Sequence, residues 1–203
     1  MIRLLSVVAL LDITGAAGIA AAEPQPPVQA TGAAAPSSHE RISGEFVYIG
    51  GEKEVAAWNA AIDKATDDMF FAIRRIARGR IRESTSIAQR VRIAFGNGNI
   101  SVFAAGDPPA VSPDNGKPIN HKSREGDAVK LSQQITADDR LTQNFVTEDG
   151  ERTVRFTVSP DGGTLSVSHT IRASRLPQDI HWTLTYQRAR SGAAAAANPM
   201  TQR

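Results

Sequence analysis

The chain has 203 residues, with 23 lysines and arginines against 21 aspartates and glutamates, and it contains no cysteine. The lack of cysteine excludes a disulfide framework, thiol catalysis and a cysteine-linked lipid anchor. Aromatic residues make up only 5% of the chain, too few for the stacking platforms of nucleic-acid binders, so no nucleic-acid partner is expected. The length suits one domain with a single hydrophobic core.

The start of the chain has the pattern of a signal peptide over residues 1–22. Arg3 gives a basic start, residues 4–11 are mostly apolar, and the alanines at 20–22 form a small-residue cleavage site. The alternative is a retained membrane anchor, which Asp12 disfavours because a carboxylate near the centre of a span costs about 2.5–3.5 kcal/mol. We therefore expect a periplasmic or secreted bacterial protein, with no stable membrane span after cleavage.

Composition divides the rest of the chain into three parts. Residues 23–40 are rich in proline, alanine and serine without periodicity, which is typical of a disordered linker. Residues 41–188 form the expected single β-barrel-like domain. Residues 189–203 contain a run of alanines too short for an independent helix and are expected to form a disordered tail.

A short strand at 44–49 is expected first, followed after Gly50 and Gly51 by one long amphipathic helical segment. Apolar residues repeat there at spacings of three and four, which predicts a stripe that faces the core. The stripe contains Val55, Trp58, Ile62, Ala65, Met69, Ile73 and Ile76. Gly79 is expected to end the helix, and a division into two shorter helices near Asp67 is the alternative.

Apolar and polar residues alternate along most of the remaining chain, which is typical of strands with one buried face. A long loop with prolines is expected at 106–116, and Asn97 with Gly98 indicates a tight hairpin. Strands are expected near residues 81–87, 91–95, 100–105, 117–122, 128–135, 141–147, 153–158, 165–171 and 180–187. The predicted fold is mainly β: a β-barrel, or a strongly curved antiparallel meander of about 8–10 strands, with the helical segment after the first strand.

The order of these elements resembles the calycin group, the lipocalin and fatty-acid-binding β-barrels. The resemblance covers roughly residues 42–188 at the level of architecture. Lipocalins often carry a Gly-x-Trp motif near the start, and Phe46 stands in the tryptophan's place after Gly44. Fatty-acid-binding barrels bind a carboxylate through an arginine and a tyrosine two residues apart on the last strand. Tyr186 and Arg188 have that spacing in reverse order.

Several polar or aromatic residues fall on the apolar side of the alternation and are candidate ligand contacts. Polar groups that converge in an apolar cavity fix the orientation of a small molecule. The candidates are His169, Tyr186, Arg188, Trp182, Phe156 and Gln143. The alternative is an ordinary core in which each polar group is satisfied within the protein.

An arginine cluster at the end of the helical pattern suggests a basic surface patch. It contains Arg74, Arg75, Arg78, Arg80 and Arg82. Guanidinium groups suit phosphates and carboxylates, so an anionic envelope component is one expected partner. The alternative is that these residues complement the helix dipole and otherwise face solvent.

No nucleophile, phosphate-binding or metalloenzyme motif occurs, so an enzyme, a cofactor and a metal site are not expected. The four histidines, including His169 and His181 on opposite strand faces, are too scattered for a shared metal. The favoured hypothesis is an exported calycin-like protein that binds or carries a small apolar or amphipathic ligand. The alternative is a non-enzymatic envelope structural or interaction protein with a filled core and a basic arginine surface.

Overall fold

The computed structural model describes residues 38–136 and 140–190. The chain divides into a unit of Met1–Ala34 and a unit of Ala35–Arg203, and every described residue belongs to the second. The predicted signal peptide, most of the predicted linker and most of the predicted tail therefore lie outside the described residues. The elements in chain order are α1 Ser38–Ile42, β1 Gly44–Tyr48, α2 Gly51–Thr66, α3 Phe71–Ser84, β2 Arg90–Gly96, β3 Asn99–Ala104, β4 Ala110–Pro113, β5 Ile119–Lys122, β6 Ala128–Thr136, β7 Arg140–Val146, β8 Gly150–Val158, β9 Thr164–Ala173 and β10 Ile180–Arg188.

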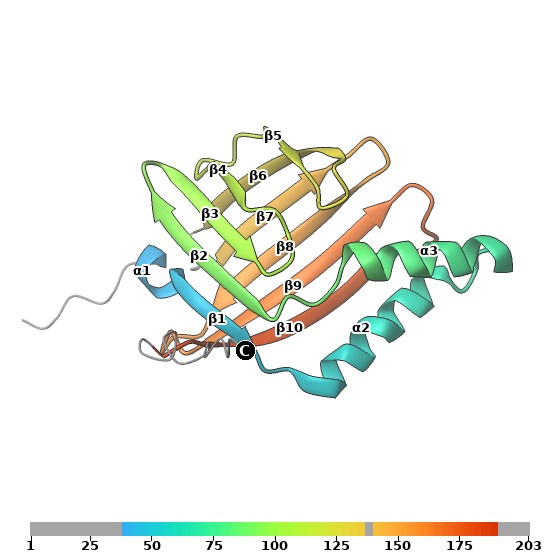
Figure 1. The fold of residues 1–203 in the computed structure, drawn as a ribbon, viewed down its shortest axis with the longest axis horizontal. Helices are drawn as coiled ribbons and strands as arrows, with labels where there is room; N and C mark the ends of the chain where they lie inside the picture. The colour runs from blue at the N-terminus through green and yellow to red at the C-terminus, as the bar shows by residue number, and fades with distance from the viewer. Residues whose placement is uncertain (1–37, 137–139, 191–203) are drawn as a thin grey trace, which may run out of the picture. The chain divides into compact units, whose positions relative to one another are not determined.

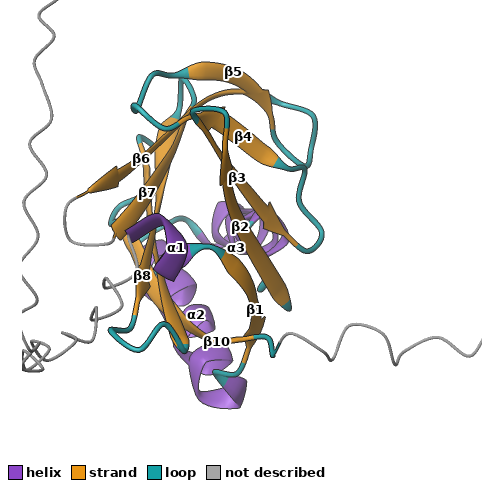
Figure 2. Ribbon diagram, turned by 90° about the vertical axis from the view of Figure 1, so that its left-hand side faces the viewer, coloured by secondary structure: helices purple, strands orange, loops and turns teal. Residues whose placement is uncertain are grey.

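The predicted fold class is confirmed. Ten strands form one antiparallel sheet in the order β4-β3-β2-β1-β10-β9-β8-β7-β6-β5, and the sheet curls into a nearly closed barrel (Figure 1). The helical pair α2–α3 follows the first strand, which is the element order that the calycin resemblance implied. Figure 2 looks toward one end of the barrel, with α1 in front and the helical pair behind the strands.

Two details of the predicted elements are wrong. The chain does not form a strand at 81–87, because α3 runs past Gly79 to Ser84. A glycine inside a helix costs only about 1 kcal/mol relative to alanine, which side-chain contacts elsewhere on the helix can offset. The predicted loop at 106–116 contains the short strand β4, whose Pro113 is tolerated at the end of an edge strand. The helical segment divides after Thr66, which confirms the alternative of two shorter helices near Asp67, and Phe70 before α3 has an extended backbone with φ −54° and ψ 136°.

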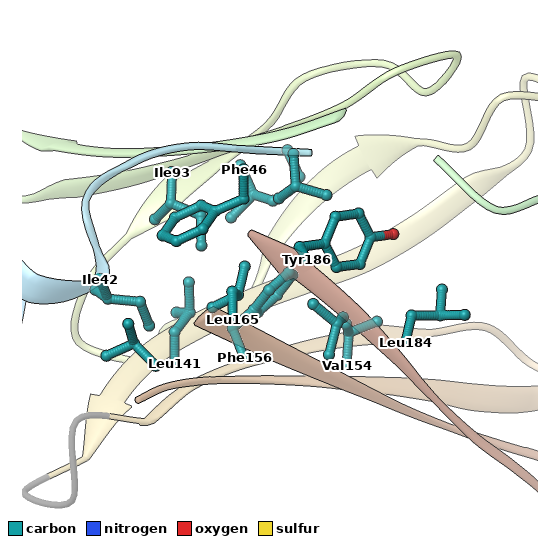
Figure 3. Close-up of a cluster of buried hydrophobic side chains, with 14 of the residues drawn as sticks. Ile42, Phe46, Ile93, Leu141, Val154, Phe156, Leu165, Leu184 and Tyr186 are labelled. Carbon is teal, nitrogen blue, oxygen red and sulfur yellow. The ribbon is translucent and has the colours of Figure 1, made fainter. Parts of the chain in front are cut away.

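The hydrophobic core is concentrated at the α1 end of the barrel. Ile42 of α1 and Phe46 of β1 are both 0% exposed, and they pack with Leu141, Leu165 and Ile93 from strands around the barrel (Figure 3). This end is therefore closed by side chains. In β8, β9 and β10 the apolar positions of the alternation are buried, except Ile171, which is half-buried.

A glutamine side chain links the two ends of the sheet. Gln133 of β6 is 0% exposed, and its amide Nε2 donates to the backbone carbonyls of Ile100 at 3.2 Å and Ala110 at 3.1 Å. These carbonyls belong to β3 and β4, on the far side of the seam between the edge strands. The amide of Gln143 donates to Gln133 Oε1 at 3.4 Å. The barrel is thus joined at this seam by side chains, with one backbone bridge between Asn115 and Gln134.

Helix α2 lies along β10 beyond the end of β1. Its Glu54 carboxylate accepts hydrogen bonds from the backbone N–H of Thr185 at 2.8 Å and from the Thr185 hydroxyl. The predicted stripe is inward along most of α2: Ile62 and Ala65 are buried, and Trp58 donates its indole N–H to Thr85 at 3.1 Å, whereas Val55 is exposed. The second half of the predicted stripe behaves differently, because Ile73 and Ile76 of α3 are exposed.

Candidate functional site

A cavity of about 370 Å³ occupies the end of the barrel opposite α1. Its inner wall is mainly apolar and includes Val91, Val102, Val129, Phe145, Val154, Phe156, Val167 and Leu184. Its mouth is formed by Ser84–Ser86 after α3, by the β3–β4 and β5–β6 loops, and by the β7–β8 turn. In Figure 3 the side chains of Val154, Leu184 and Tyr186 lie on the side away from Ile42. A volume of this size is in the range of small-molecule pockets.

One charged side chain, Arg152 of β8, projects into this apolar wall. Strand pairing places it beside Ile171 of β9 and Phe145 of β7, and all three line the cavity. Arg152 Nη1 donates to the Ser84 carbonyl at 3.3 Å, and its Nε is buried without a hydrogen-bond partner in the described structure. No carboxylate among the described residues forms an ion pair with it. Burial lowers the pKa of Arg152, yet a guanidinium keeps its proton at neutral pH.

His169 lies next to Arg152 and is the second polar group of the wall. Its ring stacks on Trp182 with ring centroids 4.6 Å apart and an interplanar angle of 4°. Burial, and after it the charge of Arg152, holds the pKa of His169 well below its ordinary value. The imidazole is therefore neutral at physiological pH. The indole Nε1 of Trp182 is buried and has no partner among the residues that the structure describes.

Tyr186 and Gln143 complete the polar side chains of the inner wall. The Tyr186 hydroxyl donates to the Ala88 carbonyl at 3.1 Å, and burial raises the pKa of this phenol. Gln143 of β7 is buried and pairs with Val154 of β8, which in turn pairs with His169 of β9. Both groups therefore offer polar atoms at fixed positions between apolar neighbours.

The mouth is held together by Arg124 of the β5–β6 loop. Its guanidinium pairs with Asp107 of the β3–β4 loop and donates to the Ser86 hydroxyl at 2.8 Å. A single side chain thus joins three segments of the rim. Because Arg124 already has a carboxylate partner, Arg152 is the cavity-lining guanidinium whose charge lacks one within residues 38–136 and 140–190.

The structure brings together four of the six candidate ligand contacts. His169, Tyr186, Phe156 and Gln143 line the cavity. Trp182 is buried behind His169 and does not line it. Arg188 lies outside the cavity, where its guanidinium sits over the Phe46 ring and donates to backbone carbonyls of Gly162 and Ser43 at 2.6 Å each.

The five arginines of the predicted basic patch divide between two faces of α3. Arg78 and Arg82 turn toward α2, where both contact Asp63, and Arg74 donates to the Met69 carbonyl. Arg75 and Arg80 are exposed, with no ion-pair partner among the described residues. The patch is therefore smaller than the cluster in the sequence suggests.

Arg152 was not among the candidates that the sequence suggested. In β8 the inward residues are Val154, Phe156 and Val158, and the same period extended by two positions toward the N-terminus reaches Arg152. The sequence signal was therefore present. An arginine in register with three apolar residues is unusual enough to indicate a site.

No group of three or more His, Cys, Asp or Glu side chains among the described residues could hold a metal ion. None of the helices described is both long enough and apolar enough to cross a bilayer.

Comparison with known proteins gives structural likenesses only. No family model and no curated protein matches the chain. A REP1-NXSQ fatty acid transporter is 12% identical over 73% of this chain and 96% of its own, with a TM-score of 0.46. A Schistosoma mansoni fatty acid binding protein in complex with arachidonic acid is 13% identical over 76% of this chain and 100% of its own, with a TM-score of 0.46. A luciferase domain from the dinoflagellate Lingulodinium polyedrum is 11% identical over 75% of this chain and 43% of its own, with a TM-score of 0.48. These likenesses do not assign the chain to a family.

Proposed function

We propose that this protein binds a small amphipathic molecule whose apolar body fills the barrel cavity and whose anionic group pairs with Arg152. The observation that carries the proposal is a guanidinium in a mainly apolar cavity wall with a buried, unpartnered Nε and no ion-pair partner among the described residues. A buried charge is costly unless it is paired, so an anionic ligand would supply what the protein lacks. His169 and Tyr186 would orient the bound molecule.

The size of the cavity favours this function over an envelope protein with a filled core. About 370 Å³ beside a row of apolar side chains leaves room for a hydrocarbon body. Native mass spectrometry of protein purified from its host is the first experiment, because a hydrophobic ligand is expected to co-purify. Protein that is repeatedly free of any bound molecule would count against the proposal.

A titration with matched ligands tests the role of Arg152. Calorimetry should detect binding of a long-chain carboxylate and much weaker binding of the alcohol of equal chain length. Arg152→Met should weaken carboxylate binding about 10- to 100-fold, because a charged hydrogen bond is worth roughly 1.5–3 kcal/mol. Arg155→Met, on the same strand with an exposed side chain, is the control. Equal affinity of wild type and Arg152→Met would refute the assignment.

We also propose that the protein acts outside the cytoplasm, in the periplasm or as a secreted protein. The support is the basic start, apolar stretch and alanine site within residues 1–22. Fractionation of the host together with the intact mass of the purified protein tests this. A cytoplasmic protein that retains residues 1–22 would contradict it.

A further inference from the structure

Helix α3 exposes a set of large apolar side chains. Phe70 just before the helix is 66% exposed, Phe71 is 73% exposed, and Ile73 and Ile76 are 60% exposed each. No residue of α3 is buried. Large exposed apolar side chains gathered in one short segment mark an interaction site. We refer to Phe70, Phe71, Ile73 and Ile76 as the α3 apolar face.

Behind Ile73 and Ile76, the other side of α3 is fixed to α2 by arginines. Arg82 Nη2 lies 2.8 Å from Asp63 Oδ1, Arg78 Nε lies 3.1 Å from the same oxygen, and Arg78 Nη2 lies 2.8 Å from Asp67 Oδ1. Rotation of α3 to bury Ile73 and Ile76 would break these contacts. These two side chains are therefore held outward by the ion pairs behind them.

Unpaired positive charge borders the α3 apolar face. Arg75 and Arg80 are exposed and have no ion-pair partner within the described part of the chain. Residues 67–84 contain five arginines against Asp67, Asp68 and Glu83, so the segment is cationic overall. An apolar helix face flanked by arginines matches the interface of a bilayer with anionic lipids, where aromatic rings enter the headgroup region and guanidinium groups meet phosphates.

The helical pair also projects beyond the end of the barrel, where a flat surface can contact it. Figure 1 shows the turn between α2 and α3 extending beyond the end of the barrel, with α3 returning from that tip toward β2. Phe70 and Phe71 begin α3 at the tip, and Ser84 ends it at the cavity mouth. A surface that contacts the tip would thus lie on the same side of the barrel as the mouth.

We propose that the α3 apolar face docks on the surface of a lipid bilayer that contains anionic phospholipids, with Phe70 and Phe71 entering the headgroup region. Arg75 and Arg80 pair with lipid phosphates. This docking places the cavity mouth next to the membrane. The proposal goes beyond ligand binding and holds whether or not Arg152 binds an anionic molecule.

Vesicle flotation of the full chain tests the docking. The probes are vesicles of phosphatidylcholine alone and vesicles of equal parts phosphatidylcholine and phosphatidylglycerol. The protein should float with the anionic vesicles, and added salt should weaken this binding. Phe71→Trp should show a blue-shifted emission with the anionic vesicles and quenching by brominated lipid, because the new indole enters the headgroup region.

Two double variants separate the apolar and charged contributions. Phe70→Ser with Phe71→Ser should reduce binding about tenfold or more, since two aromatic rings leave the interface. Arg75→Glu with Arg80→Glu should reduce it by at least roughly fivefold per position, because each cation near an anionic surface contributes about that factor. All four residues are exposed, so both variants are expected to fold.

Matched controls make the same kinds of substitution at exposed positions elsewhere on the barrel. Val111→Ser with Val146→Ser removes exposed apolar side chains, and Arg140→Glu with Arg155→Glu makes the same charge change on exposed strand positions. Both controls should bind vesicles like the wild type. All variants keep the same N-terminal residues, so a difference among them reports on α3.

Three results would overturn the docking proposal: no binding of the wild type to anionic vesicles, equal binding by the α3 variants and the wild type, or an equal loss in the controls. Self-association through α3 without vesicle binding would also overturn it and would make a second copy the occupant. Vesicle binding by Arg152→Met should match the wild type, so failure of ligand binding and failure of docking are distinguishable.

Discussion

Arg152 Nη2 lies 3.4 Å from His169 Nδ1 in the wall of the cavity. A guanidinium can only donate, so the imidazole nitrogen must accept, which requires the neutral tautomer with its proton on Nε2. Stacking on Trp182 holds the ring in place. A neutral histidine thus orients the arginine without cancelling its charge, and that charge is left for a ligand.

Acidification should destabilise the protein through His169. Its pKa is lowered in the folded state from an ordinary value of 6.5, so below that pH the unfolded chain binds more protons than the folded one. The associated stability is complete above 6.5 and is lost as the pH falls toward the folded pKa, at up to about 1.4 kcal/mol per pH unit. His169→Gln should lose less stability than the wild type between about pH 7 and pH 5 in denaturant unfolding.

The exposed His181 provides the control for this measurement. His181→Gln makes the same substitution on the outer face of β10, outside the cavity. If His169→Gln and the wild type lose stability in parallel, the histidine titration is not the cause.

Replacing Arg152 should weaken ligand binding without weakening the fold. Arg152 has no carboxylate partner in the described structure, and its Nε is unsatisfied. Substitution of a buried charge by an apolar residue of similar length is often neutral or stabilising by about 1–4 kcal/mol. Arg152→Met should therefore unfold at an equal or higher denaturant concentration than the wild type. A marked drop in the midpoint would mean that Arg152 is a structural residue.

Breaking the Gln133 link should destabilise the barrel. Gln133→Leu removes two hydrogen bonds across the seam in a fully buried position, with an expected cost of about 1–3 kcal/mol. Equilibrium unfolding in urea gives the cost, and amide exchange should increase most in β4. Gln187→Leu, at an exposed position of β10, should change neither quantity. Unchanged exchange in β4 would show that the seam does not depend on the glutamine.

Arg188 should be required for stability and not for binding. It donates to the carbonyls of Ser43, Gly162 and Arg41 at the end of the barrel away from the cavity. Arg188→Met should lower the free energy of unfolding by about 2–4 kcal/mol, because charged hydrogen bonds are lost. Arg188→Lys should retain little of this stability, since an ammonium cannot reproduce the planar hydrogen-bonding fork of a guanidinium.

Calorimetry on Arg188→Met completes that test. Its affinity for a long-chain carboxylate should equal that of the wild type. A stable Arg188→Met protein that fails to bind the carboxylate would instead support the ligand role that the sequence suggested.

Strand register was the most predictable level of this structure. Because side chains alternate with period 2, the sequence placed His169 inside and His181 outside, and the strand pairing confirms both positions. The same period predicts that Gln133 and Gln143 point inward. The alternation does not predict the seam, because Gln133 donates hydrogen bonds to the carbonyls of Ile100 and Ala110, which are distant from it in sequence.

The helical segment shows where periodicity stops being informative. A stripe at spacings of three and four predicts one face for the core, and α2 follows this through Ile62. In α3, Arg78 pairs with the carboxylates of Asp63 in α2 and Asp67 at its end. The apolar residues Ile73 and Ile76 of the stripe are exposed. Which face is covered depends on the neighbouring helix, and sequence spacing alone does not specify that neighbour.

The seam also affects whether strands of other molecules can pair with the edges of the sheet. Among the described strands, β4 and β5 form the two edges, and each has only four residues. β4 ends in Pro113, and the amide of Gln133 reaches its backbone. Short edges that carry a proline are poor templates for strand addition. The protein therefore gains protection against edge-to-edge aggregation without a full backbone ladder around the barrel.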